Sequence, residues 1–160
     1  MTDVKTNVMR LLDQKKVPYQ AHQYPHGNEA LDGVTVAGLL GQDPDTVFKT
    51  LVAQGASKTC YVFVIPAARE LDLKKAARAV GEKSVAMLHV SELNGVTGYV
   101  RGGCSPLGMK KQLKTTLDAS AQGLPAIVVS AGKIGYQVEL APEELARLTR
   151  GQFAAVTADG

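Results

Sequence analysis

The sequence predicts an α+β fold in which a mixed, mainly antiparallel β-sheet is covered by helices. Two apolar, β-branched runs at 47–53 and 59–66 flank the polar and small residues 54–58, as in an antiparallel hairpin. Further short strand-like runs alternate irregularly with helical segments, which favours this class over a regular α/β repeat. No GxGxxG follows a strand and no GxxxxGKS or GxxxxGKT occurs, so a nucleotide cofactor is not indicated.

The N-terminal third predicts a helix, a strand and a second helix. Four apolar residues recur at helical spacing near the start of the chain: Val4, Val8, Leu11 and Leu12. We expect a cap at Thr2 or Asp3, with Pro18 ending this helix. A short strand is expected at 19–24. A short helix at 33–40 should stop at Gly41.

The rest of the chain predicts two more helices among short strands. Asp72 is suited to cap a helix that runs through Val80 and that Gly81 closes. Pro142 is suited to the first turn of a final helix ending at 148. Short strands are expected at 85–88, 98–100, 126–130, 136–140 and 153–156.

Composition and charge exclude several classes of protein. A chain of 160 residues fits one domain spanning 1–160. The longest apolar run, 60–68, contains Pro66 and is too short to cross a membrane. Residues 1–10 lack the apolar core of a signal peptide, so we expect a cytoplasmic protein. A net charge of +3 is well below that of proteins that hold duplex DNA. Cys60 and Cys104 have no metal-ligand spacing, so no metal site is expected.

Lys49 is the most informative single residue. Strand alternation places it on the same face as Val47, Leu51 and Ala53, which is otherwise apolar. Burying an unpaired ammonium costs several kcal/mol, so this side chain must reach solvent along its stem or meet an anion. A lysine that protects a sheet edge explains the pattern as well, and spacing alone leaves both interpretations open.

Two glycine-containing segments are the other candidates for a site. Segment 98–108 holds four glycines and a proline, which suits close approach of a ligand to exposed backbone N–H groups or a tight turn between strands. Segment 129–135 predicts the end of a strand, followed by a turn of small residues and Lys133. No Ser/His/Asp set can be assembled from the sequence.

Taken together, these segments give the chain a resemblance to the YbaK (prolyl-tRNA synthetase associated) editing family across nearly its whole length. The resemblance implies a barrel-like, mostly antiparallel sheet flanked by helices and, as activity, trans-editing of mischarged tRNA, most typically removal of cysteine from tRNA for proline. It also implies binding of the 3′ acceptor end of charged tRNA, with prolyl-tRNA synthetase as a further partner. The matching stretches are His22-Gln23-Tyr24, 47–51, 71–75, 97–99, 102–108, 129–130 and 132–133.

The resemblance also implies roles for individual residues. Lys49 would be the central residue and would hold the RNA end near its phosphate or ribose, with Thr50 and Tyr24 lining the same cavity. The loop residues Gly102, Gly103 and Ser105 would shape the pocket and offer backbone donors to the ester carbonyl. Ser130 and Lys133 would form the opposite wall. The nucleophile would be the thiol of the cysteinyl substrate itself, so the protein would only have to orient the reacting atoms.

Several positions depart from the family pattern and leave the preferred amino acid and tRNA open. Cys104 stands where the family usually has an aliphatic residue, Ala131 where it has a glycine, and Ile134 where it has an arginine. Arg101 replaces a hydrophobic residue, and Val34-Thr35 replaces an acidic pair. Two alternatives stand beside the deacylase. One is a thiol hydrolase that uses Cys104, and the other is a non-catalytic module that binds tRNA or a synthetase.

Overall fold

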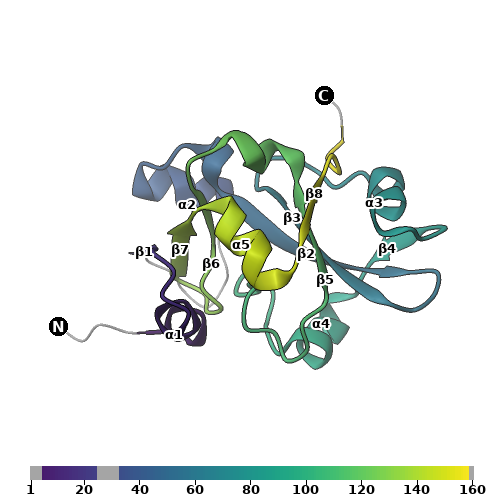
Figure 1. Ribbon diagram of the computed structural model, residues 1–160, viewed down its shortest axis with the longest axis horizontal. Coiled ribbons are helices and arrows are strands. Elements are labelled where there is room, and N and C mark those ends of the chain that lie inside the picture. Colours follow the sequence, from purple (N-terminus) through teal and green to yellow (C-terminus); the bar gives the residue numbers. More distant parts are fainter. Residues whose placement is uncertain (1–4, 25–32, 159–160) are drawn as a thin grey trace.

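The computed structural model describes residues 5–24 and 33–158, in which helices surround two β-sheets (Figure 1). The α-helices are α1 (Asn7–Gln14), α2 (Gly33–Leu40), α3 (Leu73–Val80), α4 (Val90–Thr97) and α5 (Pro142–Thr149). Two 3₁₀ helices are η1 (Pro44–Thr46) and η2 (Ala119–Gly123). The strands are β1 (Gln20–Gln23), β2 (Phe48–Gly55), β3 (Cys60–Pro66), β4 (Val85–Met87), β5 (Lys114–Asp118), β6 (Ile127–Ser130), β7 (Tyr136–Leu140) and β8 (Gln152–Ala154).

The strands form a small sheet and a larger one. The small sheet has the order β1-β7-β6 and is antiparallel throughout. The larger sheet has the order β4-β2-β3-β5-β8, with antiparallel pairs around β2 and parallel pairs around β5. A parallel bridge between Val47 and Val128 joins the two sheets. The α+β class and the mainly antiparallel pairing are confirmed, but the described strands form two sheets and no closed barrel.

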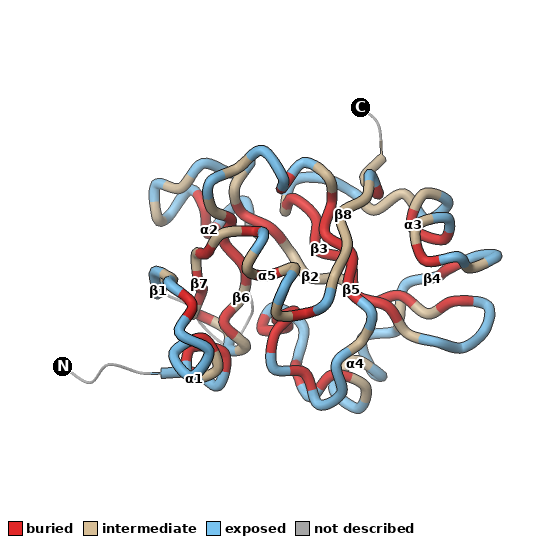
Figure 2. The backbone as a smooth tube through the Cα atoms, in the orientation of Figure 1, coloured by how far each residue is buried: buried red, intermediate tan, exposed pale blue. Residues whose placement is uncertain are grey.

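The core lies on both faces of the central strands. Figure 2 shows that buried residues concentrate on central strands such as β3 and β5, whereas many exposed residues lie in the helices and loops. One large apolar cluster includes Val8 and Leu12 of α1 together with Phe48 and Val52 of β2. A second cluster, under α3, contains Ala53 and Ile65. Because β2 packs on both faces, its side chains alternate between the two clusters.

Local capping signals correctly predicted α2 and α3. Helix α2 ends at Leu40, and Gly41 follows it with φ of +66°. The Asp72 side chain accepts hydrogen bonds from the backbone N–H groups of Lys74 and Lys75, each at 3.0 Å, and Gly81 closes α3 with φ of +74°. These ends were predictable because an aspartate cap and a left-handed glycine act within one helical turn.

The first helix begins later than predicted. The Thr6 hydroxyl accepts from the Met9 N–H at 3.3 Å, so Thr6 is the cap of α1. Thr2, Asp3 and Val4 lie outside the described residues. The hairpin loop is also shorter than predicted, because Gln54 and Gly55 still belong to β2.

The strand predicted at 98–100 is wrong. Gly98 has φ of +85° and closes α4, a helix that the sequence reasoning did not predict, and Tyr99 and Val100 follow in a loop. Strand β5 was also missed because its segment is polar. Thr115 and Thr116 are nevertheless fully buried, and their hydroxyls hydrogen bond to the Leu113 carbonyl and to Gln152. Within the described residues, no helix is long and apolar enough to cross a bilayer.

Candidate functional site

The two sheets separate immediately after the Val47–Val128 bridge. The bridge is isolated, so the ladder does not extend to Lys49 and Ser130. Strand β4 pairs with β2 only at Ala53 and beyond. Among the described residues, the stretch of β2 between these points therefore has a strand partner only in β3. We call the place where β2 and β6 cease to pair the sheet gap.

Lys49 lies at the sheet gap, level with Ser130. Both residues are two positions beyond the bridge, on the same face as Val47 and Val128. Ser130 pairs in turn with Gln137 of β7. Lys49, Ser130 and Gln137 thus form a row across three neighbouring strands. By this register, two residues that the resemblance assigned to one site occupy equivalent positions on β2 and β6, and Gln137, which sequence reasoning did not find, follows on β7.

Lys49 lies on a stretch of β2 that is locally an edge, because β4 flanks this strand only from Ala53 onward, so the edge-lysine interpretation stays beside the anion-binding one. Its face is covered near the bridge by α2, through contacts among Ala37, Val47 and Val128. Lys49 as a whole residue is half-buried.

Thr50 projects to the opposite face of β2, the side of Phe48 and Val52. Its hydroxyl oxygen is buried and has no hydrogen-bond partner. On the side of β2 away from β3, the Val52 carbonyl accepts from the Leu88 N–H at 3.0 Å. Because backbone groups alternate along an antiparallel strand, the Thr50 N–H and carbonyl point to that same side, into the sheet gap. Thr50 therefore supplies both an unpaired hydroxyl and a backbone donor.

The turn between β6 and β7 and the glycine loop 98–108 are in contact. A Cβ atom on Gly103 would lie 3.2 Å from the Ile134 nitrogen, so Gly103 permits a close approach of the two backbones. The Gly103 N–H donates to the Val100 carbonyl at 3.0 Å, so this predicted backbone donor is engaged within its own loop. Gly102 is exposed, with φ of +86°.

The predicted serines and Tyr24 hold these loops in shape. Ser105 is fully buried, and its hydroxyl accepts from the Leu107 N–H at 3.3 Å. The Ser130 hydroxyl accepts from the Gly132 N–H at 3.1 Å, at the start of the β6–β7 turn. Tyr24 is buried, and its backbone N–H donates to the Gly135 carbonyl at 2.9 Å. Tyr24 and Ser130 thus both contact the β6–β7 turn.

A cavity of about 400 Å³ opens between the glycine loop and the β6–β7 turn. Of the predicted site residues, only Lys133 lines it, and its ammonium lies 5.5 Å from the centre of the Tyr136 ring. Lys49, Thr50, Tyr24, Gly102, Gly103, Ser105 and Ser130 are not among the residues that line this cavity. The lining residues are Gly98, Tyr99, Val100, Gly132, Lys133 and Ile134.

Tyr99 is the rigid wall of this cavity and was missed as a site residue. Its hydroxyl donates to the Leu107 carbonyl at 2.6 Å and accepts from the Asn7 amide at 3.1 Å. Burial raises the pKa of Tyr99, although the Asn7 hydrogen bond opposes this. The only sequence signal was the stretch 97–99, which contributed to the resemblance but was given no role.

Cys104 is not placed to act as a nucleophile. It is 7% exposed and packs in the large apolar cluster. Burial raises the pKa of its thiol to about 11, with a hydrogen bond from Thr97 acting in the opposite direction. The thiolate is the reactive form, so this environment disfavours the Cys104 hydrolase alternative. Within the described residues, no cluster of His, Cys, Asp or Glu could hold a metal ion.

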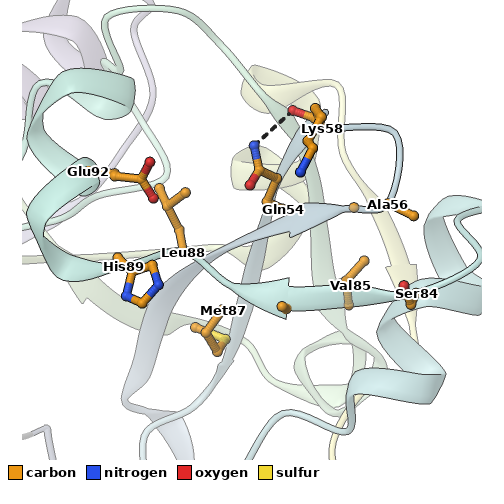
Figure 3. A pocket seen from close by; sticks show the side chains of 11 residues that line it. Gln54, Ala56, Lys58, Ser84, Val85, Met87, Leu88, His89 and Glu92 are labelled. Carbon is orange, nitrogen blue, oxygen red and sulfur yellow. Dashed lines mark hydrogen bonds between the residues drawn. The ribbon is translucent and has the colours of Figure 1, made fainter.

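A second cavity, of about 270 Å³, contains none of the predicted site residues. It lies between the β2–β3 hairpin, β4 and the start of α4. Figure 3 shows His89 and Glu92 on one side and Gln54 and Lys58 on the other, with the Gln54 amide donating to the Lys58 carbonyl at 3.2 Å.

Comparison with known proteins assigns the family. Residues 28–148 match the family described as "Aminoacyl-tRNA editing domain". This chain belongs to the aminoacyl-tRNA editing family. A relative from Enterococcus faecalis, named "Putative Cys-tRNA(Pro)/Cys-tRNA(Cys) deacylase EbsC", is 51% identical over 156 residues, which cover 98% of this chain and 95% of the relative. The YbaK resemblance is therefore confirmed.

Solved structures confirm the fold of the editing family. A crystal structure of "a putative trans-editing enzyme for prolyl tRNA synthetase" matches with a TM-score of 0.82 and 24% identity, covering 98% of this chain and 100% of the other. Another, described under "Epitope backbone grafting by computational design", matches with a TM-score of 0.84 and 26% identity, covering 96% of each chain. The two-sheet arrangement around the sheet gap is thus an editing-domain fold.

Proposed function

We propose that this protein hydrolyses mischarged aminoacyl-tRNA in trans, with cysteinyl-tRNA for proline as the preferred substrate. The observation that carries the proposal is the 51% identity to a relative named as a cysteinyl-tRNA deacylase, along nearly the full length of both chains. The task has a physical basis, because a synthetase pocket distinguishes amino acids of similar size by only about 1–3 kcal/mol. A second, hydrolytic site removes the errors that this small difference allows.

The proposed mechanism is the one that the family resemblance implies, in which the substrate supplies its own nucleophile; the burial and raised pKa of Cys104 are in keeping with it. The cysteinyl sulfur attacks the ester carbonyl carbon and forms the carbon–sulfur bond of a cyclic thioester. The bond from this carbon to the ribose oxygen breaks, and that oxygen takes up the proton lost by the thiol. Water then opens the cyclic thioester to free cysteine. The protein contributes orientation, which can supply several kcal/mol when the reacting atoms are held in contact.

Each group at the gap has a role in this proposal. The Lys49 ammonium holds the phosphate or ribose of the acceptor end, since a charged donor makes the stronger hydrogen bonds to such groups. The Thr50 backbone N–H faces the gap, where it can stabilise negative charge developing on the carbonyl oxygen. Gly102, Gly103 and Ser105 shape one wall, and Tyr24, Ser130 and Lys133 belong to the other. No step requires a metal or a cofactor.

The partner and the place of action follow from this substrate. We propose that the chain acts as one editing domain over 1–160 on the 3′ end of charged tRNA in the cytoplasm. Contact with prolyl-tRNA synthetase is the corresponding proposal for a protein partner, supported by the similarity in fold to a trans-editing enzyme for that synthetase.

The proposal is tested by the release of cysteine from charged tRNA by the wild type and by Lys49→Ala. Loss of one charged hydrogen bond should lower kcat/KM by roughly 10- to 100-fold. Lys114→Ala, an exposed lysine at the start of β5, is the matched control and should keep wild-type turnover. Undiminished turnover by Lys49→Ala would overturn the site. Tight binding of charged tRNA by the wild type without hydrolysis would favour the non-catalytic module instead.

A further inference from the structure

Strand β4 forms an open edge of the larger sheet. It is the terminal strand of the order β4-β2-β3-β5-β8 and pairs with β2. The Leu88 N–H donates to the Val52 carbonyl at 3.0 Å, so the backbone groups of Leu88 face β2. Because these groups alternate along an antiparallel strand, the N–H and C=O groups of Val85 and Met87 point away from β2. Among the described residues they have no hydrogen-bond partner, so β4 offers two donors and two acceptors to a further strand.

This edge lacks the usual protection against pairing. Natural sheets commonly block their edges with proline, with charged side chains or with a covering loop. Strand β4 has the sequence Val-Ala-Met, without a proline or a charge. Met87 is 45% exposed although it is apolar, and Val85 on the same face packs in the cluster under α3. An exposed edge with an apolar side chain is suited to the addition of a strand.

A second copy of β4 fits this edge in the antiparallel direction. When Ala86 lies opposite Ala86 of the second copy, Val85 of each copy faces Met87 of the other. Each of these two pairs exchanges two hydrogen bonds, so the free backbone groups of both copies are all satisfied. Met87 then packs against Val85 on the same face, and Ala86 at the two-fold axis is too small to clash. Because both copies use the same surface, the contact closes as a dimer.

The charges at the two ends of β4 complement each other in this arrangement. Figure 3 shows Lys58 at one end of the cavity beside β4 and Glu92 at the other. Exposed Lys83 precedes β4 at the Lys58 end. Glu82, at the same end, already accepts hydrogen bonds from two hydroxyl groups. Antiparallel pairing places the lysine end of each copy beside the Glu92 end of the other, so the attraction acts twice across the axis.

We propose that a second copy of this chain binds at β4, so that two five-stranded sheets join edge to edge in a dimer. A three-residue strand buries less than the roughly 1,200 Å² of a standard interface, so this dimer is weak and reversible. The contact is separate from the sheet gap, because Lys49 precedes the start of the β2–β4 pairing at Ala53 by about 13 Å along the strand. The inference therefore does not depend on the proposed function.

Sedimentation equilibrium over a wide range of protein concentration tests whether the full chain forms the dimer. Hydrogen exchange of individual amides tests where the contact lies. The amides of Val85 and Met87 should exchange rapidly in dilute protein and more slowly as the concentration rises. The Ala86 amide is the internal control, because it faces β2 and should be protected at every concentration.

Variants at Met87 test the strand pairing itself. Met87→Pro removes the outward N–H without disturbing the pairing with β2, and proline is tolerated on edge strands. It should weaken dimerisation by about tenfold or more, since each dimer loses two hydrogen bonds. Met87→Lys keeps the backbone N–H but places a charge on the edge, and it should weaken dimerisation as well. Met87→Leu is the matched control and should stay within about threefold of wild type. Urea unfolding checks that each variant remains folded.

Three results would overturn the inference. They are a monomer at every concentration, a dimer whose Val85 and Met87 amides stay unprotected, and dimerisation that Met87→Pro and Met87→Lys both leave unchanged. Protection of these amides only after prolyl-tRNA synthetase is added would assign the edge to a strand of that protein instead. Concentration-dependent protection that both variants abolish would support the pairing of two copies.

Discussion

Gly132 lies so close to Tyr99 that a Cβ atom at this glycine would come within 3.0 Å of the tyrosine ring. The same atom would lie 2.9 Å from the Asn7 side-chain oxygen and 3.1 Å from Val8. Gly132 also has a backbone φ of +91°, which residues other than glycine rarely adopt. The contact between the β6–β7 turn, α1 and the glycine loop therefore depends on the absence of a side chain at this position.

Gly132→Ala should damage both stability and turnover. The added methyl group meets Tyr99 and adopts an unfavourable φ, so the free energy of unfolding should fall by about 1–3 kcal/mol. Displacement of Tyr99 should also reduce deacylation. Urea unfolding and cysteine release measure the two effects. Gly123→Ala is the control, because a Cβ there meets nothing within 4 Å. Equal stability of the two variants would contradict the close packing.

Thr50→Val should separate stability from activity. The Thr50 hydroxyl is buried without a partner, so its replacement by a methyl group should leave the free energy of unfolding unchanged or raise it by about 1 kcal/mol. If the hydroxyl serves the substrate, kcat/KM should fall nonetheless. Thr116→Val is the control, because the Thr116 hydroxyl accepts from Gln152 at 3.1 Å and its loss should destabilise the fold. Full activity of Thr50→Val would remove Thr50 from the site.

The elements that were predictable are those whose signals are local. Asp72 and Gly81 fix α3 from within one turn, and the period of two along β2 correctly placed Lys49 with Val47. Strand β5 was not predicted because its segment is polar and the group that hydrogen bonds to Thr116 comes from a distant segment. The alignment of Lys49, Ser130 and Gln137 could not be predicted from the sequence either, because it depends on a bridge between two strands that no turn connects. Strand alternation singled out Lys49 and the family resemblance supplied Ser130, whereas Gln137 and the position of Tyr99 in the cavity wall came from the structure alone.

Asp118 should make stability depend on pH. Burial alone would raise the pKa of this carboxyl, but hydrogen bonds from the Ser120 hydroxyl and from backbone N–H groups, including that of Val156 at 3.0 Å, outweigh it and lower the pKa. A lowered folded-state pKa contributes stability that is present above the unfolded value of about 3.9 and is lost as pH falls through the folded value.

Asp118→Asn is the test of this linkage. The variant should be less stable at pH 7 by about 1–3 kcal/mol, because an amide cannot accept all of these hydrogen bonds. Its stability should also fall less than that of the wild type as the pH drops below about 4. Thermal unfolding across pH 3–7 measures both effects, with exposed Asp45→Asn as control. Parallel pH profiles for wild type and Asp118→Asn would refute the role of Asp118.

Cys104→Ser and Cys104→Ala should retain deacylation. The Cys104 thiol is buried and its pKa is raised to about 11, so only a small fraction is thiolate near neutral pH. We expect kcat to stay within about threefold of wild type, with a modest loss of stability from the altered packing. Single-turnover release of cysteine from charged tRNA is the measurement. A variant that folds normally but releases no cysteine would restore Cys104 as a nucleophile.

The thiol of the substrate should be required for fast turnover. Seryl- and alanyl-esters on the same tRNA share the backbone of the cysteinyl ester but lack sulfur, so they cannot form the cyclic thioester. Because a well-oriented intramolecular nucleophile has an effective concentration of about 10⁵ M or more, their hydrolysis should be slower by several orders of magnitude. Parallel single-turnover assays with the three esters measure this difference, and mass spectrometry should detect the cyclic thioester early in the cysteinyl reaction. Equal rates for all three esters would show that water attacks the carbonyl directly, and the sheet gap would then have to position that water beside the Thr50 N–H.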